Sequence, residues 1–300
     1  MPPHWVGFSI IVAALLAVDM LLLQRPGRPV SVRLAWLWTL FLSLLAGGYA
    51  LWIASTTGKQ PSTEFAAGYL IEASLSVDNL FVFLLLFRAL RLDAAQQRRV
   101  LLWGVLGAIV LRGVLILAGT TLLARFAWVQ YAFGVLLAFA AIRLLLHKPG
   151  ATAVRGPLHW VQTCCLRYAS STRLTLASLL LVIAAVEVTD LLFAVDSIPA
   201  VLAVTRNPWI AFTSNIFAVL GLRSLYFALA SLLDRFHLLH YGLACILAFV
   251  AFKMLAERWI AVPAGVSLVV ILAILALFVV LSLTLPAKLT ADQELSGHSR

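Results

Sequence analysis

The sequence has little charge and little sulfur. Charged residues make up 11% of its 300 residues, whereas soluble globular domains hold about 25%. The 3 cysteines are the adjacent pair Cys164 and Cys165 and the isolated Cys245, so the sequence contains no CxxC motif and no disulfide framework. The low charge excludes a soluble globular domain, and the scarcity of sulfur disfavours a copper(I) or structural zinc site.

Motifs for catalysis are equally scarce. The sequence contains no nucleotide-binding signature, no HExxH and no recognisable serine–histidine constellation. The 6 histidines fall outside the long apolar runs or at their ends, so a histidine metal site is not evident. Acidic residues alone are weak evidence for an intramembrane hydrolase. We therefore expect neither an enzyme nor a prosthetic group.

Apolar residues dominate the chain instead. They make up 63% of it, and the mean hydropathy is +1.04. Runs long enough to cross a bilayer as helices occur nine times, at residues 6–23, 34–54, 66–90, 100–124, 126–146, 174–204, 209–233, 238–255 and 260–285. The first run has no basic stretch before it and no small-residue cleavage site, so we interpret it as a retained helix. We predict an all-α, polytopic membrane protein with nine transmembrane helices.

The net charge of +10 is distributed unevenly among the loops. With the N-terminus outside and nine crossings, 14 Lys and Arg residues fall in inside segments and 4 in outside segments. Basic residues accumulate on the cytoplasmic side of a membrane. We therefore predict a multi-pass protein of the inner membrane, with its N-terminus outside and its C-terminus in the cytoplasm. The basic surplus then reflects orientation and contact with the lipid bilayer, and not nucleic-acid binding.

Two of the apolar runs, 66–90 and 174–204, carry more than one acidic residue each. The polar residues at these depths are Glu72, Asp78 and Asn79 in the first run and Glu187, Asp190, Asp196 and Ser197 in the second. Glu72 and Asp78 match Asp190 and Asp196 at one offset of 118 residues. A carboxylate at membrane depth costs several kcal/mol unless a partner neutralises it. Because the pattern occurs twice in register, a buried cation site explains it most simply.

The internal match extends beyond the acids. Arg112 corresponds to Arg223 at an offset of 111 residues, and Tyr131 corresponds to Tyr241 at an offset of 110. Each matched unit holds three apolar runs, and an odd number makes the second unit enter the membrane from the opposite side, as in many secondary transporters. We predict an inverted three-helix repeat, with two N-terminal helices in 1–65, the first repeat in 66–147, a cytoplasmic linker in 148–173, the second repeat in 174–257, and a last helix and cytoplasmic tail in 258–300.

Oxygen atoms are the donors that this pattern offers to a cation. The residues that we expect to bind the metal are Glu72, Asp78, Asn79, Asp190, Asp196 and Ser197. Carboxylate, amide and hydroxyl oxygens suit Mn²⁺, Mg²⁺ or Ca²⁺. Glu187 is a candidate for a group that alternates between proton and metal, and Asn215 either adds a ligand or bridges helices.

The balance of buried charges leaves two interpretations open. Five deep acids face two deep bases, Arg112 and Arg223, which we interpret as structural partners or gating charges. The negative surplus favours a bound divalent cation, with or without a proton. The alternative is a structural ion-pair network in which some of the acids are protonated. We interpret Asp19, close to the inner end of the first run, as interfacial.

The run 174–204 is longer than a straight crossing requires. A helix of that length would reach about 46 Å, against about 30 Å for the hydrocarbon core. Pro199 removes a backbone donor and frees the carbonyl of Val195. We therefore expect the helix to break at 195–199, and the break to let Asp196 converge with Asp78.

Three segments of this sequence resemble the TerC family of integral membrane proteins. They begin at Glu72, Asp190 and Thr213 and read EASLSVDN, DLLFAVDSIPA and TSNIFAVLGLR. The resemblance covers roughly residues 66–256. It implies a place in the LysE-type transporter superfamily, whose members have inverted repeats, and it implies manganese export, in which several members are implicated. The acids matching the family's pattern are Glu72, Asp78, Asp190 and Asp196.

The sequence therefore predicts a transporter that exports Mn²⁺ or a similar divalent cation. Since no nucleotide-binding motif is present, we expect the proton gradient or the membrane potential to drive transport. The rival interpretation is a membrane factor, without transport activity, that assists the insertion, assembly or metal loading of other proteins or contributes to tellurite resistance. The proteins of that class often present a polar groove or an extramembrane domain, and neither is evident in the sequence.

Overall fold

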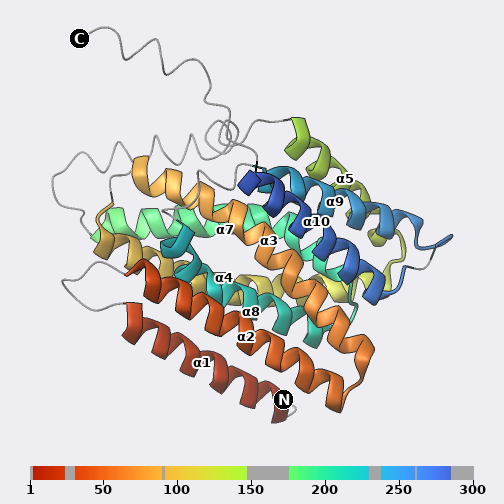
Figure 1. Cartoon of the computed structure of the whole chain (residues 1–300), viewed down its shortest axis with the longest axis horizontal. Coiled ribbons are helices and arrows are strands. Elements are labelled where there is room, and N and C mark those ends of the chain that lie inside the picture. The colour runs from red at the N-terminus through yellow and green to blue at the C-terminus, as the bar shows by residue number, and fades with distance from the viewer. Residues whose placement is uncertain are drawn as a thin grey trace, which may run out of the picture.

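The structure is a computed structural model of the chain, and it describes residues 3–23, 31–89, 92–146, 176–229, 238–260 and 262–284 (Figure 1). All regular structure in these residues is helical, which confirms the all-α prediction. The helices are α1 Pro3–Leu23, α2 Val32–Thr56, α3 Lys59–Ala89, α4 Ala94–Arg125, α5 Trp128–Leu146, α7 Leu176–Leu202, α8 Pro208–Leu229, α9 Leu239–Ala256 and α10 Ala264–Thr284. Each of these nine described helices overlaps one apolar run of the sequence.

Five of the described helical segments are long and apolar enough to cross a membrane, judged by length and composition. They are Val32–Thr56, Gln96–Arg125, Trp128–Leu146, Pro208–Ala228 and Ala264–Thr284. Apolar side chains cover much of their outer surface, as hydrocarbon surroundings require. In contrast, α8 is largely buried and therefore belongs to the interior of the bundle.

The two ends of the bundle are defined by hydrogen bonds between helix termini. At one end, which we call the Glu64 end, Thr205 just after α7 donates a hydrogen bond of 2.6 Å to Glu64 near the start of α3. At the other, the Gln97 end, Tyr226 of α8 donates to Gln97 near the start of α4 at 3.2 Å. Consequently α3 runs away from the Glu64 end and α7 runs toward it, so these two helices are antiparallel.

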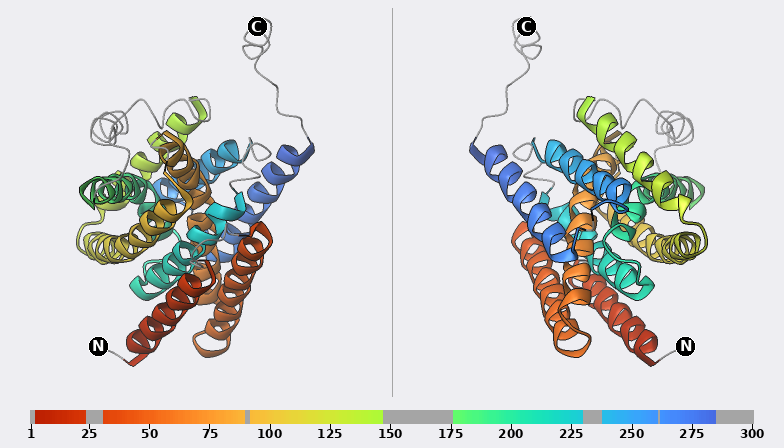
Figure 2. Two further views of the ribbon diagram at one scale, coloured as in Figure 1. Left: turned by 90° about the vertical axis from the view of Figure 1, so that its left-hand side faces the viewer. Right: turned by 90° about the vertical axis from the view of Figure 1, so that its right-hand side faces the viewer.

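Four helices, α3, α4, α7 and α8, form the centre of the bundle. Helix α3 packs on α8 and on α7, and α4 packs on α7 and on α8. Around this centre α2 packs on α3 and α8, α5 pairs with α9, and α10 contacts α3 and α9. Figure 2 shows α1 and α5 on opposite sides of the bundle. A methyl group on Gly68 of α3 would lie 2.8 Å from the hydroxyl of Ser214 in α8, so the small residue permits this close approach.

The predicted break at Pro199 is wrong. Helix α7 is continuous from Leu176 to Leu202 and includes the proline. Pro199 lies in the last turn, where losing one backbone donor removes a single hydrogen bond, and its own carbonyl still accepts from Ala203 at 2.9 Å. A helix of this length is about 40 Å long, and an oblique course accommodates the excess over a bilayer core.

Candidate functional site

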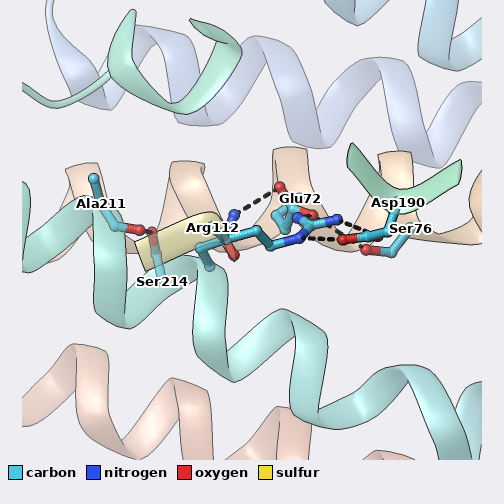
Figure 3. Close-up of polar contacts among 7 residues, drawn as sticks. Glu72, Ser76, Arg112, Asp190, Ala211 and Ser214 are labelled. Atoms are coloured by element: carbon cyan, nitrogen blue, oxygen red, sulfur yellow. Dashed lines mark hydrogen bonds and ion pairs between the residues drawn. The ribbon is translucent and has the colours of Figure 1, made fainter. Parts of the chain in front are cut away.

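A buried arginine joins the centre of the bundle. Arg112 of α4 is 0% exposed, and its Nη2 and Nε donate hydrogen bonds of 2.9 and 3.2 Å to the two carboxylate oxygens of Asp190 in α7. Its Nη1 donates to Oε1 of Glu72 in α3. Figure 3 shows the guanidinium extended between the two acids. Because one planar fork contacts both carboxylates, Arg112 ties α3 and α7 to α4.

The second oxygen of Glu72 is occupied as well. Asn215 of α8 donates from Nδ2 to Oε2 of Glu72 at 2.9 Å, and Ser76, one turn further along α3, donates to Oε1 at 3.5 Å. Glu72 and Asn215 are both 0% exposed. All four central helices therefore contribute to one network, which we call the central cluster: Glu72, Arg112, Asp190 and Asn215. The hydrogen bond to Glu72 makes Asn215 a bridge between α8 and α3, one of the two roles that the sequence left open, and its Oδ1 has no partner among the described residues.

Packing against a glycine positions the neighbouring acid Glu187. Glu187 precedes Asp190 by one turn of α7 and is partly exposed. A methyl group on Gly107 of α4 would overlap the Glu187 carboxylate. When Glu72 and Asp190 are both ionised, the single positive charge of Arg112 leaves the central cluster with one net negative charge. Glu187 adds a second negative charge when it is ionised.

The predicted convergence of Asp78 and Asp196 is wrong. Both acids follow a central acid by six residues, or about 9 Å of helix. Since α3 and α7 are continuous and antiparallel, Asp78 is displaced toward the Gln97 end and Asp196 toward the Glu64 end. Asp196 is half-buried and interacts electrostatically with Arg143 of α5. The side chain of Asp78 lies outside the described part of the structure.

The polar residues that follow these two acids are buried without partners. Asn79 is 2% exposed and Ser197 is 0% exposed. Their Nδ2 and Oγ atoms have no hydrogen-bond partner among the described residues. Buried polar atoms of this kind normally have a partner. The Ser197 hydroxyl oxygen can ligate a cation, whereas the Asn79 Nδ2 is a hydrogen-bond donor, so Asn79 stays a candidate ligand only through its Oδ1.

A second ion pair lies between α1 and α8. Arg223 of α8 is 0% exposed, and its Nη1 donates a hydrogen bond of 2.5 Å to Asp19 of α1. Asp19 is 3% exposed, so it is buried between helices, and its interfacial depth in the membrane stays a prediction. Beside it, Thr39 of α2 donates to Ser224 at 2.9 Å. The signal that could have identified Asp19 is Arg223 itself, because a buried base requires an acid on a neighbouring helix.

The arrangement resembles an ion-pair network more than a preformed metal cage. Among the described residues, no group of three or more His, Cys, Asp and Glu side chains could hold a metal ion. The oxygens of Glu72, Asp190 and Asn215 are the right chemical type for a hard divalent cation. The guanidinium of Arg112 occupies the position between the acids that such a cation would take. A cation would therefore bind here in place of Arg112.

Comparison with known proteins identifies similar chains. The family model described as "Integral membrane protein TerC family" matches residues 57–290. Proteins printed as "Putative membrane-bound redox modulator Alx" are 41% identical in Salmonella typhi, over 94% of each chain, and 42% identical in Escherichia coli K12, over 91% of this chain and 92% of the relative. A Photorhabdus laumondii protein of the same printed name is 38% identical over 94% of each chain. No solved structure matches.

Proposed function

The chain belongs to the TerC family of integral membrane proteins, and we propose that it is a transporter that exports Mn²⁺ or a similar divalent cation from the cytoplasm. It is a multi-pass membrane protein whose cargo is the cation itself, so we assign it neither an enzymatic reaction nor a prosthetic group. In this proposal Glu72, Asp190 and Asn215 form the middle of the cation path. Asp78 with Asn79 and Asp196 with Ser197 flank it on the two sides, and Glu187 exchanges protons.

The observation that carries the proposal is the buried central cluster. Two carboxylates from antiparallel helices face each other with a single guanidinium between them. Charged groups at membrane depth usually mark an ion or proton path. A structural ion pair would need one acid for one base, whereas Arg112 has two acids and a third close by. The negative surplus favours a place for a mobile cation.

The helix packing supports an inverted repeat, on which many alternating-access transporters are built. The pairs α3–α8 and α4–α7 correspond under the repeat, and both are in contact. Gly104 approaches Val186 in the second pair, and Gly68 approaches Ser214 in the first. The offset of 118 residues maps Gly68 onto Val186, and the offset of 111 residues maps Gly104 to within one residue of Ser214, so the two approaches correspond. We extend the proposal to nine crossings in the inner membrane, with the Glu64 end outside and the Gln97 end and C-terminus in the cytoplasm.

The relatives' printed name raises a second candidate, redox modulation. Among the described residues the free cysteine is Cys245, while Cys164 and Cys165 lie outside the described part of the structure. We attribute any redox effect of this chain to the amount of redox-active cation that it removes. Replacing Cys164, Cys165 and Cys245 together by Ser should leave both cation transport and any redox effect unchanged. A redox effect that disappears in this variant would favour direct thiol chemistry.

The experiment that tests the function is a flux assay with purified protein in liposomes. Mn²⁺, Mg²⁺, Ca²⁺ and Zn²⁺ are supplied one at a time under an imposed proton gradient, and entry is read from a trapped metal-sensitive dye. We expect flux of Mn²⁺ above that of empty liposomes, with Zn²⁺ disfavoured by the oxygen ligands. Absence of flux for all four cations would refute transport and would favour the rival role of an assembly or metal-loading factor.

A further inference from the structure

Two corresponding arginines have different surroundings in this structure. Arg112 and Arg223 lie 111 residues apart at matched positions of α4 and α8, and both are 0% exposed. Arg112 donates from Nε, Nη1 and Nη2 to the central acids. Arg223 donates from Nη1 to Asp19, and its Nε and Nη2 have no hydrogen-bond partner among the described residues. Buried unpaired donors are costly, so among the described residues Arg223 lacks part of its full set of partners.

The repeat identifies the missing partner of Arg223. The sequence offsets map the contact between Arg112 and Asp190 onto a contact between Arg223 and Glu72. In this structure the oxygens of Glu72 instead accept from Arg112 and Asn215. The repeat therefore predicts that either arginine can contact the Glu72 carboxylate, and in this structure Arg112 contacts it.

Each arginine also has a second acid nearby that is not one of the two central acids. Arg223 contacts Asp19 of α1, a helix that precedes the repeat. Glu187 lies against α4 at Gly107, one turn of α7 before the acid that Arg112 now contacts. No hydrogen bond to Glu187 occurs among the described residues. It is therefore placed to receive Arg112 if Arg112 leaves Asp190.

On the basis of the proposed function, we propose that Arg112 and Arg223 alternate at Glu72 and Asp190 as the transporter changes the side to which it opens. In the state of this structure Arg112 contacts the central acids and Asp19 retains Arg223. In the opposite state Arg223 contacts the central acids and Arg112 moves to Glu187. The cation binds to the central acids in the interval, because it displaces whichever guanidinium is present.

The exchange gives α1 a role that the repeat alone does not. Asp19 stabilises one state by holding Arg223 away from the centre. A purely structural ion pair would stabilise both states equally. The difference between these roles is measurable without any transported ion.

Hydrogen–deuterium exchange of the full-length protein in lipid nanodiscs distinguishes them. The variants are Asp19→Asn, Arg223→Gln and the double variant, and the readout compares α3 and α7 peptides from the Glu64 end with those from the Gln97 end. Asp19→Asn releases Arg223 and should change the ratio of exchange between the Glu64 end and the Gln97 end in one direction. Arg223→Gln prevents the opposite state and should change this ratio in the opposite direction. The double variant should match Arg223→Gln, because once Arg223 is replaced the change at Asp19 has no guanidinium left to release.

Shifts in the same direction, or a double variant milder than both single variants, would overturn the proposal and leave a structural ion pair. If Asp19→Asn does not fold, Arg112→Lys gives the same test, since lysine cannot contact both central acids. It should shift exchange in the direction opposite to Arg223→Gln, and a common direction would again overturn the proposal. If the wild-type protein transports Mn²⁺ but the variants show no opposed shifts of exchange, the alternation is refuted and the transport function stands. If the variants show opposed shifts but the wild-type protein transports none of the cations, transport is refuted and the alternation stands.

Discussion

Arg112 and Asp190 are joined by two hydrogen bonds, of 2.9 and 3.2 Å, that connect the two matched halves of the chain. The contact is buried at both partners. A bidentate arginine–carboxylate pair fixes both distance and angle between the helices that carry it. Movement of one half against the other therefore either breaks this contact or requires both partners to move together.

Replacement of Arg112 by Gln should destabilise the protein strongly. The change leaves Glu72 and Asp190 facing each other without a cation, and breaking a buried ion pair from one side costs about 3–5 kcal/mol. The thermal unfolding midpoint in detergent measures the effect. Arg125→Gln, at the exposed end of α4, is the matched control and should leave the midpoint unchanged. Equal midpoints for the two variants would show that the ion pairs of Arg112 do not stabilise the fold.

Replacement of Gly107 by Ala should impair the protein more than its small size suggests. The added methyl group overlaps the Glu187 carboxylate, and overpacking of this kind costs about 1–3 kcal/mol. Gly47→Ala is the control, since no atom of the described structure lies within 4 Å of a methyl group there. Alanine favours a helix over glycine by up to about 1 kcal/mol, so the control should be neutral or stabilising. An impaired control with an unaffected Gly107→Ala would contradict the packing described here.

The helices were predictable from the sequence because hydrocarbon leaves the backbone no alternative to internal hydrogen bonds. The run 126–146, for instance, became α5 Trp128–Leu146. The pairing of charges was not predictable to the same extent. Matched offsets related Glu72 to Asp190, but Arg112 contacts both of them because α4 packs on α7, which in turn packs on α3. That packing is a tertiary property that no spacing within one helix encodes.

Two features of the site were not evident from the sequence. The expected break at Pro199 assumed that a long helix must unwind, whereas α7 continues through the proline to Leu202, and the Pro199 carbonyl still accepts from Ala203. The interfacial interpretation of Asp19 gave its place along the run but not its neighbours. Contact of α1 with α8 buries Asp19 against Arg223, and that contact is a tertiary property.

Replacement of Pro199 by Ala should be tolerated. Alanine restores a donor for the Val195 carbonyl in a helix that is already continuous. Proline is less favourable than alanine by about 3 kcal/mol inside a helix, and in the last turn we expect a gain of about 1 kcal/mol or less. Unfolding midpoint and Mn²⁺ flux should both equal or exceed the wild-type values. Loss of flux at normal stability would mean that the proline has a functional role that the continuous helix does not account for.

Reporter fusions should place the C-terminus in the cytoplasm. The 14 to 4 distribution of Lys and Arg between inside and outside segments motivates this orientation. A green fluorescent protein fused after Arg300 should fluoresce, and alkaline phosphatase at the same position should be inactive. Active phosphatase there would reverse the orientation or change the number of crossings.

The most direct test is Mn²⁺ flux into liposomes containing Glu72→Gln or Asp190→Asn, each compared with wild type and with Glu257→Gln. The two central variants keep the shape of the side chain and remove the charge that a divalent cation needs. Glu257 forms an exposed ion pair with Arg206, which contributes little. At equal amounts of folded protein, both central variants should lose flux by about tenfold or more, equivalent to roughly 1.4 kcal/mol, and Glu257→Gln should keep it. Wild-type flux in both central variants would contradict a cation path through Glu72 and Asp190.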